Sequence, residues 1–166
     1  MFNNIFNEDD MIKFQEILKQ RGETITCAES CTGGLISSMI TEISGSSSIF
    51  RGSIITYANE IKEQELKVKK ETMIEYGVVS IPVVEQMLQG VLKKFDSTYA
   101  MAVSGVAGPN GGTDEKPVGT VVIGVMSRYG SKNIEIYHFK GGRKEVQIQA
   151  AKTAFRRNFE ILLKNP

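Results

Sequence analysis

The feature that most constrains the fold is a strand–turn–helix pattern near the start of the chain. A β-branched run at 24–26 leads into a small polar cluster, and Gly33 and Gly34 then precede an apolar periodic segment over 35–43. Such runs favour a strand, a tight turn and a helix, in that order. The pattern places Ser30 at the mouth of a helix N-terminus, where unpaired N–H groups and the helix dipole favour negative charge. That position suits the oxyanion of an attacked carbonyl, or a bound phosphate.

The rest of the chain alternates helices with strands and then ends in a hairpin and a long helix. We expect a first helix capped by Asp9 or Asp10 and ending near Gly22. The further elements expected are a strand over 24–28, a helix over 32–43, a strand over 50–57, helices over 60–66, 70–76 and 81–95, strands over 99–104, 118–128 and 133–139, and a helix over 143–164. This order predicts an α/β fold, a three-layer α/β/α sandwich with a mixed sheet, in one domain over residues 1–166.

Length and charge restrict the classes of function. The chain has 166 residues, enough for a single domain with a real core, and a formal net charge of +1. The lysines at 67, 69 and 70 are flanked by glutamates, which favours a solvated helical face. The sequence has no tryptophan and no series of aromatic residues for stacking on bases, so we expect no nucleic-acid partner.

Targeting and metal signals are missing from the sequence. The first ten residues lack a basic and apolar leader pattern, and no run approaches the roughly 20 apolar residues that span a bilayer. We therefore expect a cytoplasmic protein without membrane contact. Cys27 and Cys31, four residues apart across the expected turn, are unsuited to a structural disulfide. One histidine and two cysteines give no zinc-ligand spacing, so we expect no metal and no cofactor.

Three residues are candidates for a nucleophile or its partner. Ser30 is the first, although Ser30 or Thr32 could equally serve only as a helix cap. Cys31 is a second candidate beside a helix N-terminus, but a buried structural cysteine is the commoner case. His138, the only histidine, would have to complete a Ser-His-Asp triad, and its place in an alternating strand favours a sheet-face residue instead.

The segment 57–62 (Tyr-Ala-Asn-Glu-Ile-Lys) offers a candidate base. If Asn59 caps the following helix, Lys62 lies in the first turn. The helix dipole opposes a cation there, and partial burial would also favour the neutral amine. A neutral lysine can take the proton of a serine hydroxyl. From this segment alone, however, an exposed helix lysine is the favoured alternative, because most lysines are exposed.

Two glycine-rich segments are candidates for ligand binding. The loop over 105–119 follows the expected central strand, where α/β sheets place ligand crevices, and its length favours a function. Its glycines permit a close backbone approach, but it matches neither a P-loop nor a dinucleotide turn. Gly141, Gly142 and Arg143 precede the last helix and suit a phosphate, with a plain strand-to-helix turn as the alternative.

Four segments together resemble the CinA C-terminal family, over roughly residues 8–163. They are 28–34 (Ala-Glu-Ser-Cys-Thr-Gly-Gly), 57–62, 104–112 (Ser-Gly-Val-Ala-Gly-Pro-Asn-Gly-Gly) and 116–120 (Lys-Pro-Val-Gly-Thr). The resemblance implies a three-layer α/β/α fold and a metal-free serine hydrolase. It also implies the form that stands alone, without the N-terminal domain of longer members.

The resemblance further implies a reaction and a set of residues. The reaction is hydrolysis of the carboxamide of nicotinamide mononucleotide to nicotinate mononucleotide and ammonia. Ser30 matches the nucleophile, Lys62 the base, and Tyr57 an orienting or relaying group. We expect backbone N–H groups of 32–34 or 105–108 to stabilise the oxyanion. The expected substrate contacts are Thr32, Gly33, Gly34, Ser104, Gly105, Gly108, Gly112 and Arg143.

One segment departs from the family pattern. Before the last helix the family often reads Gly-Asp-Arg-x-x-Val-Arg, whereas this chain has Gly142 for the aspartate and Gln147 for the second arginine. If that segment binds a phosphate, the affinity is weakened or Lys144 compensates. The alternative function is a non-catalytic nucleotide-binding regulatory module, which ammonia release from nicotinamide mononucleotide would exclude. A homodimer is also left open.

Overall fold

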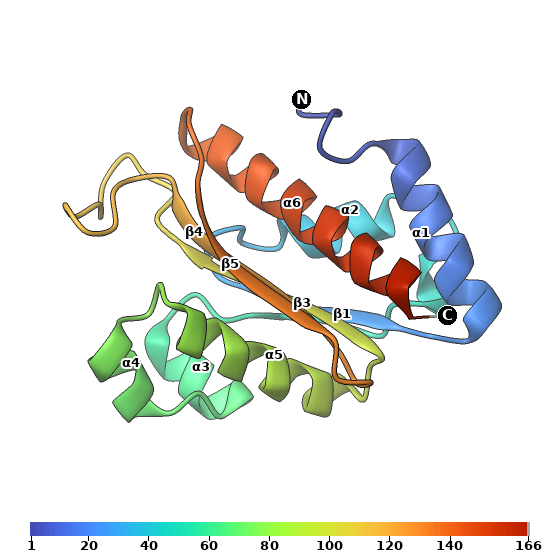
Figure 1. Ribbon diagram of the computed structural model, residues 1–166, viewed down its shortest axis with the longest axis horizontal. Helices are drawn as coiled ribbons and strands as arrows, with labels where there is room; N and C mark the ends of the chain where they lie inside the picture. Colours follow the sequence, from blue (N-terminus) through green and yellow to red (C-terminus); the bar gives the residue numbers. More distant parts are fainter. Residues whose placement is uncertain (166) are drawn as a thin grey trace.

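The computed structural model describes residues 1–165, which form two helical layers around one sheet (Figure 1). The chain runs through α1 (Glu8–Arg21), β1 (Ile25–Glu29), α2 (Leu35–Thr41), the short 3-10 helix η1 (Ser46–Ser48), β2 (Ile54–Ile55), α3 (Asn59–Leu66), α4 (Lys70–Tyr76), α5 (Ile81–Phe95), β3 (Tyr99–Gly105), β4 (Thr120–Ser127), β5 (Lys132–His138) and α6 (Arg143–Lys164).

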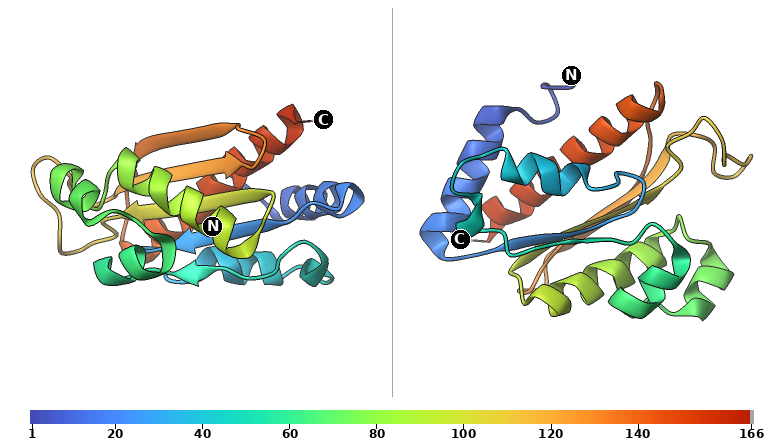
Figure 2. Two further views of the ribbon diagram at one scale, coloured as in Figure 1. Left: turned by 90° about the horizontal axis from the view of Figure 1, so that it is seen from below. Right: turned by 180° about the vertical axis from the view of Figure 1, so that it is seen from behind.

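The sheet is mixed and has the order β2-β1-β3-β4-β5. Strand β1 pairs in parallel with β2 and β3, whereas β3, β4 and β5 pair antiparallel. Helices α1, α2 and α6 cover one face, and α3, α4 and α5 cover the other (Figures 1 and 2). This arrangement confirms the predicted three-layer sandwich. Because β1 and β3 are parallel, their carboxyl ends meet at one edge, where α/β sheets hold ligands.

Side chains along β3 alternate between two cores. Met101 and Val103 face the layer of α1, α2 and α6, and Ala100 and Ala102 face α5. The small residues on the α5 side allow that helix to pack closely against the sheet. Gly124 on β4 shows how closely, since a Cβ there would stand 2.6 Å from the Cδ1 atom of a leucine on α5.

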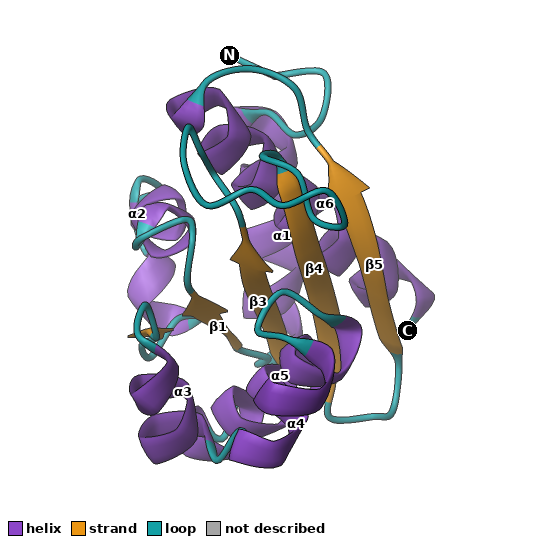
Figure 3. Cartoon of the chain, turned by 90° about the vertical axis from the view of Figure 1, so that its left-hand side faces the viewer, coloured by secondary structure: helices purple, strands orange, loops and turns teal. Residues whose placement is uncertain are grey.

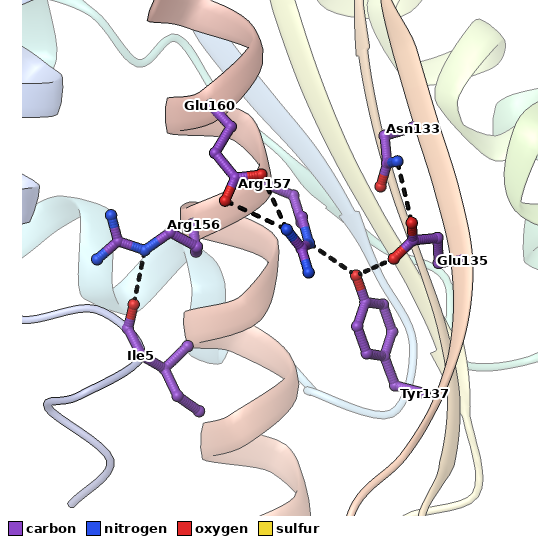
Figure 4. Close-up of polar contacts among 7 residues, drawn as sticks. All are labelled: Ile5, Asn133, Glu135, Tyr137, Arg156, Arg157 and Glu160. Atoms are coloured by element: carbon purple, nitrogen blue, oxygen red, sulfur yellow. Dashed lines mark hydrogen bonds and ion pairs between the residues drawn. The ribbon is translucent and has the colours of Figure 1, made fainter.

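A polar network joins α6 to the edge strand β5 (Figure 4). Arg157 donates to the Tyr137 hydroxyl at 2.9 Å, and that hydroxyl donates to Glu135 at 2.8 Å. Arg157 also forms an ion pair with Glu160 at 2.9 Å. Burial raises the pKa of Tyr137 above its usual value, so the phenol keeps the proton it donates. The network fixes the edge strand β5 to α6. The first residue of this helix, Arg143, lines the cavity described in the next subsection.

Several predicted boundaries were wrong. The strand expected over 50–57 is reduced to β2, with a single bridge between Phe50 and Ile25, because this segment lies at the edge of the sheet, where it has β1 on one side only. The helix expected from residue 32 begins at Leu35. The first helix is capped by Asn7, which receives the backbone N–H of Asp10 at 2.8 Å. Among the helices of residues 1–165, none combines the length and apolar character needed to cross a membrane.

Candidate active site

A cavity of about 310 Å³ lies at the carboxyl ends of β1 and β3. Figure 3 views the molecule from this end of the sheet. The cavity is bounded by the turn after β1, the start of α3, the glycine-rich loop after β3, and the first residue of α6. Its lining residues are Ser30, Cys31, Tyr57, Asn59, Lys62, Val78, Val79, Ser104, Gly105, Val106, Ala107, Gly108, Asn110, Gly111 and Arg143.

Ser30 and Lys62 meet inside this cavity. The Lys62 ammonium nitrogen lies 3.3 Å from the Ser30 hydroxyl oxygen and donates to the Thr56 carbonyl oxygen at 2.7 Å. Lys62 is only 1% exposed, although its residue type is rarely buried. Ser30 is 9% exposed and opens onto the cavity. The structure therefore brings together a hydroxyl and an amine that lie 32 residues apart in the chain.

The surroundings of Lys62 favour its neutral form. Burial lowers the pKa of Lys62 below the ordinary value, and the nearby Cys31 has a smaller opposing effect. Within residues 1–165, Lys62 forms no ion pair with a carboxylate that would hold the proton. Helix α3 begins at Asn59, and its cap is Ala58 instead of the expected Asn59. Lys62 is therefore the fourth residue of the helix. It still lies in the first turn, where the helix dipole disfavours a cation.

Arg143 and Tyr57 bridge the mouth of the cavity. The Arg143 guanidinium donates to the Gly108 carbonyl oxygen at 2.5 Å and to the Tyr57 hydroxyl at 3.1 Å. Tyr57 is 61% exposed. Across residues 1–165 no hydrogen bond joins Tyr57 to Ser30 or Lys62, so this conformation contains no proton relay through the tyrosine. The geometry instead places Tyr57 as a wall of the entrance.

The turn residues Thr32, Gly33 and Gly34 are not among the cavity's lining residues. The Gly33 N–H donates to the Ser30 carbonyl oxygen at 3.0 Å. The Gly34 N–H and the Thr32 hydroxyl donate to one carboxylate oxygen of Glu29, at 3.2 and 2.7 Å. These three groups already have acceptors inside the protein, and the expected contacts of residues 32–34 with a substrate stay a prediction.

The glycine-rich loop supplies the opposite wall. Ser104, Gly105 and Gly108 line the cavity as expected, and the Ser104 hydroxyl donates to the Val78 carbonyl oxygen at 3.1 Å. Gly112 does not line it. A Cβ at Gly112 would stand 2.8 Å from the nitrogen of residue 118, so this glycine closes the loop upon itself. Its expected role as a substrate contact stays a prediction.

Cys31 and His138, the other two candidates for catalysis, lie as their non-catalytic alternatives predicted. Cys31 is buried, and His138 lies on a strand of the sheet. Burial raises the pKa of the Cys31 thiol to about 12, so it stays protonated near neutral pH. His138 lies on β5 with Nδ1 3.3 Å from the Thr120 hydroxyl, and it does not line the cavity. In residues 1–165, no group of three His, Cys, Asp or Glu side chains is arranged to hold a metal ion.

Three residues that support the site through hydrogen bonds were given no such role by the sequence analysis. Glu29 receives hydrogen bonds at the start of α2, Thr56 accepts from Lys62, and Gln147 on α6 donates to the Cys31 carbonyl oxygen at 2.9 Å. Glu29 gave a signal, since a charged residue at the end of an apolar strand needs a partner, and Gln147 was noted only as a departure from the family pattern. Thr56 and Gln147 act through contacts between elements that the local pattern does not show.

Comparison with known proteins places these motifs in a family. The model of the CinA C-terminal domain matches residues 9–162. The chain is 47% identical to the CinA-like protein of Syntrophomonas wolfei over 82% of this chain and 33% of that protein. It is 43% identical to the nicotinamide-nucleotide amidohydrolase PncC of Escherichia coli K12, over 90% of this chain and 91% of that protein. The chain thus spans about a third of the CinA-like relatives and nearly all of PncC.

Solved structures agree with this placement. A CinA superfamily protein from Klebsiella pneumoniae 700603 superposes with a TM-score of 0.88 at 31% identity, covering 93% of this chain and 96% of that one. The competence/damage inducible protein of Agrobacterium tumefaciens gives a TM-score of 0.86 at 35% identity, covering 93% and 92%. The fold observed here is therefore also the fold of those proteins.

Proposed function

This chain belongs to the CinA C-terminal domain family, and from that premise we propose that it is an amidohydrolase acting on nicotinamide mononucleotide. The products are nicotinate mononucleotide and ammonia. The observation that carries the proposal is the 3.3 Å approach of the buried Lys62 amine to the Ser30 hydroxyl inside a cavity. The name of the similar Escherichia coli protein supports the choice of a nicotinamide nucleotide as substrate.

The reaction proceeds through an acyl-enzyme. Ser30 attacks the carboxamide carbon while neutral Lys62 takes the hydroxyl proton. The C–N bond then breaks, and the Lys62 ammonium returns that proton to the leaving nitrogen, which departs as ammonia. Water attacks the ester carbon and gives a proton to Lys62. The bond between that carbon and the Ser30 oxygen then breaks, Lys62 returns the proton to this oxygen, and the acid product loses its own proton to solvent. No step of this cycle needs a metal ion, so activity is expected to survive a chelator.

The loop over 105–108 is the proposed source of oxyanion donors. It faces Ser30 across the cavity, and its glycines allow the backbone to approach the reacting carbonyl. The N–H groups of Gly33 and Gly34 are assigned to other acceptors and are not needed. Tyr57 is proposed to flank the bound nucleotide at the entrance rather than to pass on the proton.

The charge of the cavity suits a substrate that carries a phosphate. Its lining residues include the cation Arg143, beside the proposed neutral base Lys62, but no aspartate or glutamate. Arg143 stands at the mouth, where the phosphate of a nucleotide can lie while its base reaches Ser30. Gln147 is occupied with the Cys31 carbonyl oxygen, so Arg143 is the proposed phosphate contact.

The test is ammonia release from nicotinamide mononucleotide by the purified protein, with Ser30→Ala and Cys31→Ser as a matched pair. Ser30→Ala should lose several orders of magnitude in kcat, because a nucleophile acts as part of a unit. Cys31→Ser should keep most of the activity. If Ser30→Ala kept a tenth of the wild-type activity, Ser30 would not be the nucleophile. Binding of the nucleotide without turnover by the wild-type protein would favour the regulatory module.

A further inference from the structure

The carboxylate of Glu29 is fully buried and is surrounded by donors from the turn that follows it. One oxygen, Oε1, accepts from the Thr32 hydroxyl at 2.7 Å, the Gly34 N–H at 3.2 Å and the Ile36 N–H at 2.9 Å. The other oxygen, Oε2, accepts from the N–H and the hydroxyl of Ser37 at 3.0 and 2.7 Å. The last residue of β1 thus holds the first residues of α2 through its side chain.

Ser30 lies inside the loop that this side chain closes. The segment 30–34 leaves β1 at Glu29 and returns to the Glu29 carboxylate at Gly34. Gly33 and Gly34 take the positive φ angles of +60° and +106° that such a tight return requires. The position of the Ser30 hydroxyl therefore depends on the hydrogen bonds between the Glu29 carboxylate and the start of α2.

The backbone of Glu29 is connected to the base as well. Its carbonyl oxygen accepts from the Thr56 N–H at 2.7 Å. The carbonyl oxygen of the same Thr56 accepts from Lys62 at 2.7 Å. Glu29 is thus one residue from the hydroxyl and, through Thr56, two hydrogen bonds from the amine.

The pattern of donors suits a carboxylate and no neutral substitute. Both oxygens face a backbone N–H, from Ile36 on one side and Ser37 on the other, and a backbone N–H cannot reverse its direction. A glutamine would turn its own NH2 toward one of them in either orientation, leaving two donors opposed. Removing the acceptor also leaves buried N–H groups without partners.

We propose that Glu29 is a positioning residue for the hydrolysis, holding Ser30 in line with Lys62 without touching the substrate. The proposal rests on the function proposed above. It separates two roles within one motif, because Ser30 supplies the nucleophile and Glu29 supplies the shape of the turn. A displacement near 1 Å at a reacting group can reduce the rate about 100-fold.

The decisive variant is Glu29→Gln, with Glu23→Gln as its matched control. Glu23 is 8% exposed, stands just before the other end of β1, and accepts from the Tyr129 hydroxyl at 2.8 Å. Each substitution removes one buried carboxylate, either at Glu29 within β1 or at Glu23 just before it. We expect Glu29→Gln to reduce kcat about 100-fold with KM changed less than threefold, and Glu23→Gln to leave kcat unchanged. The pH at which kcat/KM rises should stay in place in Glu29→Gln, because Lys62 is intact.

A second measurement follows Ser30 without the natural substrate. A fluorophosphonate probe should label wild-type Ser30, and its labelling rate should fall in Glu29→Gln in proportion to kcat. If Glu29→Gln does not fold, Ser37→Ala removes one hydroxyl donor and should give a smaller loss of about tenfold in both rates. Thermal unfolding of each variant verifies that the assays are made on folded protein.

Each outcome has a definite meaning. An active wild-type protein with a folded, equally active Glu29→Gln overturns the positioning role and leaves the proposed function standing. An equal loss in Glu29→Gln and Glu23→Gln also overturns it, since the loss is then general destabilisation. A displaced pH profile in Glu29→Gln would make Glu29 a proton-transfer group instead. A wild-type protein that neither hydrolyses the nucleotide nor reacts with the probe refutes the proposed function, and the positioning role with it.

Discussion

At the scale of single residues, the central fact is a buried lysine, Lys62, that pairs with no carboxylate among residues 1–165. Burial lowers the pKa of Lys62, and the Thr56 carbonyl oxygen fixes the direction in which its amine points. An amine with a lowered pKa is neutral in a larger fraction of molecules near neutral pH than an exposed lysine, whose pKa is about 10.4. In the proposed mechanism, the same burial that is unfavourable for the charge prepares a base for Ser30.

The first prediction concerns the chemistry of that amine. Lys62→Ala should lose most of the kcat, and Lys62→Arg should fail to restore it, because a guanidinium stays protonated. In the wild-type protein, kcat/KM should rise with pH through an apparent pKa below that of free lysine, a value that belongs to the coupled Ser30–Lys62 pair. Steady-state ammonia release between pH 5 and pH 10 measures both. Full activity in Lys62→Arg would mean that Lys62 acts through its positive charge and is not the base.

The second prediction concerns the mouth of the cavity. Arg143→Ala should raise KM for nicotinamide mononucleotide by removing a charge-assisted contact of about 1.5–3 kcal/mol. It should affect the riboside, which has no phosphate, much less. Tyr57→Phe is the control, since it removes the hydroxyl that Arg143 contacts and leaves the guanidinium in place. Equal losses on both substrates would assign Arg143 to holding the loop at Gly108.

Sequence reasoning predicted that Ser30 and Lys62 act together, and the structure places them 3.3 Å apart, but it did not predict the residues that hold them there. Ser30 and Lys62 carry chemistry in their residue types and lie in motifs that can be recognised in the chain. Glu29, Thr56 and Gln147 act through contacts that exist only once β1, β2 and α6 are packed together. The same holds at the start of α2, because the sequence pattern cannot show that the neighbouring Glu29 carboxylate accepts from the Gly34 N–H.

At the scale of elements, the packing of α3 against α5 sets the position of Lys62. Gly90 on α5 is the point of closest approach, and a Cβ there would stand 2.1 Å from the Leu66 carbonyl oxygen at the end of α3. The long amphipathic helices were predictable because their period is local, although the first helix begins at a cap other than the expected one. A strand was also predicted where β2 lies, but its extent was wrong, because β-propensity depends on neighbours that the local sequence does not contain.

The third prediction tests this packing. Gly90→Ala should push α3 away from α5, lowering the free energy of unfolding by about 1–3 kcal/mol despite the gain in helix propensity. It should also reduce kcat, because α3 carries the base. Gln89→Ala, at the exposed neighbouring position of the same helix, is the control and should change neither quantity appreciably. Urea unfolding and ammonia release provide the two readouts. A stabilised Gly90→Ala with full activity would show that the helices can separate freely.

At the scale of the whole molecule, the site lies at one edge of the sheet and is closed by elements from both helical layers. Arg143 comes from the layer of α6, and Lys62 comes from the layer of α3 and α5. The sheet between them carries Ser30 at the end of β1. Folding of the entire domain is therefore needed to assemble the site, and the buried amine influences the stability of the whole chain.

The fourth prediction follows from that influence. The pKa of Lys62 is lower in the folded protein than in the unfolded chain, so unfolding takes up a proton at any pH between the two values. Stability contributed by this group is complete above about pH 10.4, the ordinary pKa of lysine, and is lost as the pH falls through the folded-state value. Lys62→Met keeps most of the length of the side chain and removes this dependence. The variant also loses the hydrogen bond to Thr56, which gives an offset that does not change with pH.

The difference in unfolding free energy between wild type and Lys62→Met should therefore move in favour of the wild type as the pH rises from 7 to 10. The change approaches about 1.4 kcal/mol for each unit by which burial lowers the pKa. Guanidinium unfolding of both proteins at pH 7, 8.5 and 10 measures it, and Lys140→Met, at an exposed lysine, provides the control in which no such change is expected. A difference that stays constant over this range would mean that Lys62 keeps its proton in the folded protein, and the serine would then need another base.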